Sequence, residues 1–128
     1  MDEIKFEDII FLDNDEIKKV LREVDMNDLM ISLSGPVNNL LKEKILFNMS
    51  PRAAAMLIDD LEFFLGDDLE YGPPRLVEEK QNGILKVIQT LMEQGEIHTD
   101  FSKKDLYKQM IERSKEESQE KVDDDFPE

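Results

Sequence analysis

Apolar residues recur at three- and four-residue intervals along most of this chain, and residues typical of helix ends separate the runs. The first run follows Asp13 and Glu16, which have the three-residue spacing of a capping box. Its apolar positions predict a helix over residues 14–24. Helices with one apolar face bury that face by packing against one another, so the repeated pattern predicts an all-α fold.

Two further helices are expected in the first half of the chain. Asp25 is suited to cap a second helix, which Ser34-Gly35-Pro36 should stop. This helix is apolar almost all round, which is typical of a helix buried on most sides. Pro36 fits the first turn of a third helix, which should extend to about Met49.

Residues 50–95 predict two longer helices joined by a loop. Ser50 has the position of an N-cap, Pro51 that of the first helical residue, and Gly66 that of a terminator after Leu65. Turn residues then fill 66–74. The next apolar stripe predicts a helix over 76–94, and Gly95 should end it.

Composition narrows the classes of function. The 128 residues contain no cysteine, which excludes disulfides, thiol catalysis and cysteine-ligated zinc. The formal net charge of −15 disfavours nucleic acid and anionic lipid as partners. Solubility alone accounts for such a charge, and a basic protein partner is the sharper alternative. No apolar run is long enough for membrane insertion, and residues 1–5 do not resemble a secretory signal, so a cytoplasmic location is expected.

Motifs for catalysis are missing. The chain has one histidine, His98, and a single histidine is more often a surface or packing residue than a catalyst. It has no phosphate loop, nucleophile elbow or zinc-protease motif. Asp13-Asn14-Asp15 hints at a calcium loop, but the glycine and the closing glutamate at the required spacing are absent. We therefore expect a protein that is not an enzyme and that needs no cofactor or metal.

Several segments resemble, in order, the C-terminal domain of the bacterial flagellar motor switch protein FliG. They are Phe6 to Asp13, Val20 to Asp25, Asn48 to Ala54, Asp59 to Leu61, Gly72 to Leu76 and Glu93 to Ile97. The combination of Asn-Met-Ser-x-Arg-Ala-Ala, an acidic pair and Gly-Pro-x-Arg-Leu is specific. The resemblance covers about residues 3–99, and we expect a domain over 1–99.

The resemblance implies a compact bundle or superhelical stack of about six helices, which in the family follows an armadillo-like middle domain. It also implies a place at the outer rim of the flagellar rotor, at the cytoplasmic base of the flagellum. There, charged side chains of one helix face the cytoplasmic loop of the stator protein MotA, and torque and switching depend on that contact. Further partners in the rotor would be a FliM-like switch protein or full-length FliG.

Motif positions carry four stator-facing residues over to this chain. Arg52 matches the arginine of Asn-Met-Ser-x-Arg, Asp59 and Asp60 match the acidic pair, and Arg75 matches the arginine of Gly-Pro-x-Arg. Arg52 and Asp59 are seven residues apart and should lie on one helix face. Such charges are also typical of any solvated helix face. Phe6 resembles the last aromatic of the family hinge.

The chain departs from the family pattern in several places. Ser34 stands where the family commonly has a lysine before a glycine, which removes one charge of the array. Residues 62–71 form an insertion, within which Asp67-Asp68 also resembles the acidic pair; the spacing from Arg52 favours Asp59 and Asp60. Residues 100–128 have no family counterpart and predict an amphipathic helix, capped at Ser102, with an acidic, disordered tail.

Three functions follow from these observations. The first is a rotor-side motor component, which without the family's other domains would need another protein to hold it in the ring. The second is a repurposed adaptor on the same fold, which predicts an exposed apolar patch around Phe63, Phe64 and Leu65. The third is an acidic mimic that binds a basic partner and should lose its affinity as salt rises.

Overall fold

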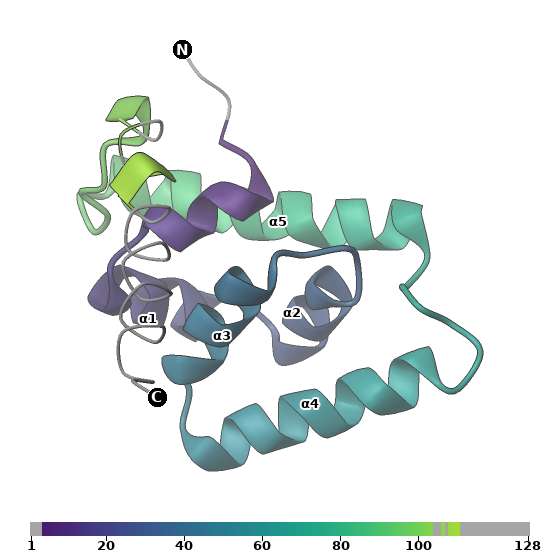
Figure 1. Ribbon diagram of the computed structural model, residues 1–128. Coiled ribbons are helices and arrows are strands. Elements are labelled where there is room, and N and C mark those ends of the chain that lie inside the picture. The colour runs from purple at the N-terminus through teal and green to yellow at the C-terminus, as the bar shows by residue number, and fades with distance from the viewer. Residues whose placement is uncertain (1–3, 104–105, 107, 111–128) are drawn as a thin grey trace, which may run out of the picture. The chain divides into compact units, whose positions relative to one another are not determined.

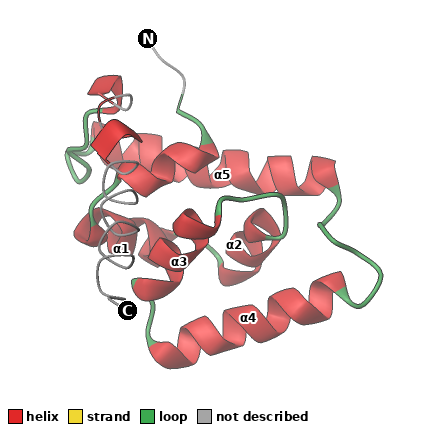
Figure 2. Ribbon diagram, viewed as in Figure 1, coloured by secondary structure: helices red, strands yellow, loops and turns green. Residues whose placement is uncertain are grey.

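The computed structural model describes residues 4–103, 106 and 108–110, and in this part of the chain every regular element is a helix (Figures 1 and 2). The all-α prediction is confirmed. The chain divides into two units, of which the larger comprises Glu3–Thr99. The elements in order are η1 (Phe6–Phe11), α1 (Asn14–Glu23), α2 (Met26–Leu33), α3 (Asn39–Phe47), α4 (Pro51–Leu65), α5 (Pro74–Glu93) and η2 (Phe101–Lys103).

Most of the predicted helix ends are confirmed by hydrogen bonds. Asp13 and Glu16 form the capping box of α1, with the Glu16 backbone N–H donating to the Asp13 carboxylate over 2.8 Å. The Asp25 carboxylate accepts from the first turn of α2. Gly66 and Gly95 follow α4 and α5 with positive φ angles of 60° and 77°, which glycine adopts without a steric penalty.

One predicted helix start is wrong, and one helical element was not predicted. Pro36 does not begin the third helix; α3 starts at Asn39, and the Asn38 side chain caps it by accepting from the Leu40 backbone N–H. The Asn38 side-chain oxygen satisfies a backbone donor of the first turn, whereas a proline side chain has no hydrogen-bond acceptor. The apolar run near the N-terminus forms a 3₁₀ helix, η1, which periodicity over so few residues did not indicate.

The core of the larger unit is built on α2 and α5, which make the most extensive contact between elements. In Figure 1, α5 lies along one side of α2 and α4 along the other, and the purple η1 lies against α5. The apolar residues of α2 are buried as predicted, from Leu29 to Leu33. This double-sided packing places α4 at the edge of the unit.

A buried carboxylate fixes the end of the larger unit. Glu16 is 4% exposed, and its side chain accepts from the backbone N–H groups of His98 and Thr99, and from the Thr99 hydroxyl. Burial raises the pKa of Glu16, but these hydrogen bonds together with that from Asp13 outweigh it and hold the pKa below its ordinary value. The chain that leaves α5 is thereby tied to α1.

The smaller unit contains the expected C-terminal helix, of which little lies in the described residues. Residues 106 and 108–110 are helical. Ser102 lies inside η2, where its hydroxyl donates to the Asp100 carboxylate, and the 3₁₀ turn around it was not predicted. Tyr107 and Ile111, which belong to the apolar stripe expected for this helix, lie outside the described residues, as does the acidic tail over 112–128.

Candidate functional site on the exposed face of α4

Local sequence signals define α4 at both ends. The Ser50 hydroxyl accepts from the Ala53 backbone N–H over 3.1 Å, and Pro51 occupies the first turn, where its missing N–H costs no hydrogen bond. The positive φ of Gly66 ends the helix after 15 residues. These local signals therefore fix where α4 begins and ends.

Three of the four predicted site residues are exposed on α4. Arg52, Asp59 and Asp60 all face solvent, and in the described part of the chain none of them forms an ion pair. At 100° per residue, Arg52 and Asp59 lie about 20° apart around the helix and Asp60 lies about 80° from Arg52. Their charges remain available to a partner.

Sequence reasoning considered Phe63 only in a possible patch with Phe64 and Leu65, and it missed that Phe63 aligns with Met56 in an apolar stripe beside these charges. Met56 is 58% exposed and Phe63 is 90% exposed, and both lie within about 60° of the sector defined by Arg52 and Asp59. The spacing 52, 56, 59 and 63 is that of one helix face, and it could have revealed the stripe. The candidate site thus alternates charged and apolar side chains.

An open hollow lies beside this stripe, between α2 and α4. Its volume is about 490 Å³. The residues that line it are Asn27, Met30, Asp60, Phe63 and Phe64. Met30 is buried and Phe64 half-buried, whereas Asp60 and Phe63 are exposed. A carboxylate therefore stands next to an apolar depression.

The fourth predicted stator-facing residue and the predicted hinge residue lie on other elements. Arg75 is exposed at the start of α5, after the connection 66–73, so α4 itself does not carry it. Phe6 is 7% exposed in η1, an element that contacts α3 and α5. Phe6 is a core residue in this structure, and its role as a hinge stays a prediction.

Ser34 and the insertion meet in the structure. Ser34 is 2% exposed, its hydroxyl donates to the Ile31 carbonyl, and its carbonyl accepts from the Gly72 backbone N–H over 2.9 Å. A Cβ at Gly72 would lie 2.2 Å from the Ser34 hydroxyl oxygen and 3.0 Å from the Phe64 ring. Gly72, the first residue after the insertion, thus covers residue 34, so a buried contact and not an exposed charge occupies this position.

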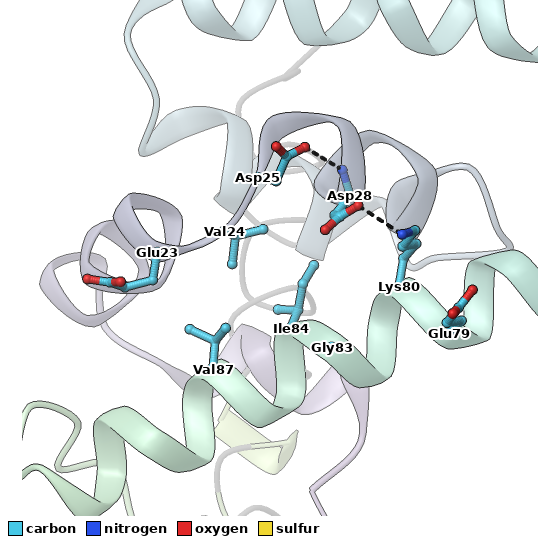
Figure 3. Close-up of a pocket in the computed structure, with 9 residues that line it drawn as sticks. All are labelled: Glu23, Val24, Asp25, Asp28, Glu79, Lys80, Gly83, Ile84 and Val87. Atoms are coloured by element: carbon cyan, nitrogen blue, oxygen red, sulfur yellow. Dashed lines mark hydrogen bonds and ion pairs between the residues drawn. The ribbon is translucent and has the colours of Figure 1, made fainter.

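Figure 3 shows a second depression, of about 190 Å³, between the α1–α2 turn and α5. Val24, Ile84 and Val87 form its apolar floor. Its central carboxylates already have partners, because Asp25 caps α2 and Asp28 pairs with Lys80 over 3.2 Å. We interpret this depression as part of the joint that holds α2 on α5.

The fold and the site together define an all-α domain that presents a charged helix at its edge. The family model described as "FliG C-terminal domain" matches residues 3–99, and this chain belongs to that family of flagellar motor switch proteins. It is 51% identical to the flagellar motor switch protein FliG of Thermotoga maritima and 47% identical to that of Borreliella burgdorferi, each over 94 residues. The predicted family is confirmed.

Coverage is unequal in these comparisons. The matches cover 72% of this chain but only 26% and 25% of the two relatives, so the chain spans about a quarter of their length. A crystal structure of FliG residues 86–343 from H. pylori superposes with a TM-score of 0.68 at 32% identity, covering 75% of this chain and 42% of that one. The family is one of motor switch proteins and not of enzymes. No helix in the described residues has the length and apolar character of a membrane span.

Proposed function

We propose that this protein is a rotor-side component of a flagellar motor and contacts the cytoplasmic loop of a MotA-like stator protein through α4. The observation that carries the proposal is the exposure of Arg52, Asp59 and Asp60 on the helix that the family motif defines. Arg75 is a further contact residue at the start of α5. A FliM-like protein or a full-length FliG would hold the chain in the rotor.

The electrostatics of α4 fit a contact that must form and break at each step. Unpaired exposed charges attract an oppositely charged segment within the Debye length, which is about 8 Å at physiological salt. They raise the association rate more than the final affinity. A rotor that moves past a stator needs such short-lived, salt-sensitive contacts.

Charge reversal in motile cells tests the proposal. In a strain that lacks the chromosomal copy, Asp60→Lys should leave flagella assembled but abolish or strongly reduce swimming. Asp68→Lys is the matched control, because Asp68 is also exposed but lies beyond α4, in the segment that gives the alternative alignment of the acidic pair. Normal swimming with Asp60→Lys would overturn the proposal, and loss of swimming with Asp68→Lys alone would move the acidic pair to 67–68.

One observation favours the second candidate, a repurposed adaptor. Of the three residues expected in its apolar patch, Phe63 is exposed, while Phe64 and Leu65 are half-buried. An adaptor would tolerate deletion of the gene with normal motility. Flagellated but paralysed deletion cells would exclude it.

A further inference from the structure

Phe63 is the most exposed large hydrophobic residue in the described part of the chain. Removal of a phenylalanine side chain from water is strongly favourable, so its exposure at 90% marks a surface that is available for contact. It does not stand apart from the proposed stator site. It lies about 40° around the helix from Asp59, one turn further along α4.

The hollow beside Phe63 is lined by residues of both α2 and α4. Phe64 follows Phe63 about 100° further around the helix, and one edge of its ring lies 3.0 Å from the position that a Cβ at Gly72 would take. Met30 of α2, 7% exposed, also lines the hollow. An apolar side chain that enters the hollow therefore meets Phe63, Phe64 and Met30, with the Asp60 carboxylate close by.

We infer that α4 binds its partner through apolar as well as charged contacts, and that the hollow between α2 and α4 receives an apolar side chain of the stator loop. That side chain neighbours a basic residue of the loop, which pairs with Asp59 or Asp60. Phe63 and Met56 thus supply the part of the contact that salt does not screen. This inference rests on the proposed function and names the chemistry of its partner.

The charge of α4 argues for this occupant over a second copy of the chain. Between Pro51 and Leu65 the helix carries one arginine and three acids, Asp59, Asp60 and Glu62. In a dimer that paired two copies of this face, like charges would lie together, and each chain has a formal net charge of −15. The acidic residues 112–128 are disfavoured for the same reason. A basic and apolar segment complements the surface in both respects.

Tryptophan fluorescence tests the inference directly, because the chain contains no tryptophan. Phe63→Trp places a single indole on the stripe, and Phe47→Trp is the matched control, since Phe47 is 77% exposed at the end of α3 and does not line the hollow. The probe is the purified cytoplasmic loop of the MotA-like protein encoded in the same genome. On its addition, the emission at position 63 should shift to the blue and become protected from acrylamide, while that at position 47 stays unchanged.

A salt series separates the two kinds of contact. Phe63→Ser should weaken loop binding by about tenfold or more at all salt concentrations, and Phe47→Ser by less than about twofold. Asp60→Asn should instead reduce the salt dependence of the affinity. Helicity measured by circular dichroism should match the wild-type chain in each case, because all three positions are exposed.

The outcomes distinguish this inference from the function on which it rests. If the wild-type chain does not bind the loop at all, the proposed stator contact fails and this inference fails with it. If the loop binds but the indole at 63 is unchanged and Phe63→Ser binds as tightly as the wild-type chain, the apolar contact alone is overturned and the electrostatic function stands.

Discussion

The helices α5 and α4 are the two longest among the described residues, and they are packed in opposite ways. α5 contacts α1, α2 and η1, and four of its side chains are buried, whereas α4 contacts mainly α2 and buries only Leu57. Helix ends in α4 are nevertheless as well defined as in α5. The comparison teaches that α5 stabilises the unit, while α4 is free to carry side chains selected for contact with a partner.

The largest test of this contrast is the loss of a buried side chain from α5. Ile88 is completely buried, and Ile88→Ala should lower the free energy of unfolding by about 2–5 kcal/mol, because it removes buried methyl groups and leaves a cavity. Met56→Ala on α4 is the control and should change it by less than about 1 kcal/mol. Urea denaturation followed by circular dichroism measures both. Equal losses would mean that α4 belongs to the core after all.

The single buried residue of α4 sharpens the comparison. Leu57→Ala should cost about 2 kcal/mol, at the low end for such a change because the site lies at the edge of the unit. Its effect should be local, since little else holds α4 in place. Amide hydrogen exchange should show faster opening of α4 than of α5. Uniformly faster exchange across both helices would contradict the independence of α4.

A pair of glycine substitutions tests the joint beneath the end of α4. Gly72→Ala should destabilise the protein by about 1–2 kcal/mol, because the new Cβ would collide with Ser34 and Phe64. Gly83→Ala in α5 is the control: nothing lies within 4 Å of its Cβ position, and it should stabilise by about 0.5–1 kcal/mol through higher helix propensity. Thermal unfolding measures both the expected loss and the expected gain of stability. If Gly72→Ala left the stability unchanged, the connection 66–73 would be able to move away from Ser34 and Phe64.

The smallest expected effect concerns acid stability. The pKa of Glu16 is lowered in the folded state, so its charge contributes stability that is complete above the ordinary value of 4.5 and is lost as the pH falls through the folded pKa. Glu16→Gln should lower the free energy of unfolding by about 1 kcal/mol at neutral pH. It should also reduce the loss of stability as the pH falls, because the titrating group is removed. Glu23→Gln, an exposed change of the same charge, should alter stability by less than about 0.5 kcal/mol. If Glu16→Gln lost stability at acid pH as the wild-type chain does, the Glu16 carboxylate would not fix residues 98 and 99.

Much of the helix layout could be predicted from the sequence, and the reasons are local. Caps such as Asp13, Asp25 and Ser50 bond to backbone groups within three residues, so sequence spacing alone indicates them. Pro36 misled because its steric preference is compatible with a turn as well as with a helix start. The exposure of Phe63 was foreseen as one possibility but could not be decided, because periodicity places a residue on a face without showing what covers that face.

The sequence by itself determined the five α-helices, most of their ends, the family and the charges of α4, because each depends on residues that are neighbours along the chain. Only the tertiary structure decided that α2 packs on both α4 and α5, that Ser34 is covered by Gly72, and that Phe63 stands beside an open hollow. Those facts depend on residues that are far apart in the chain, such as Ser34 and Gly72 or Ser32 and Gln81. Their contacts form only when the helices pack, and no local signal records which face of α4 is left uncovered.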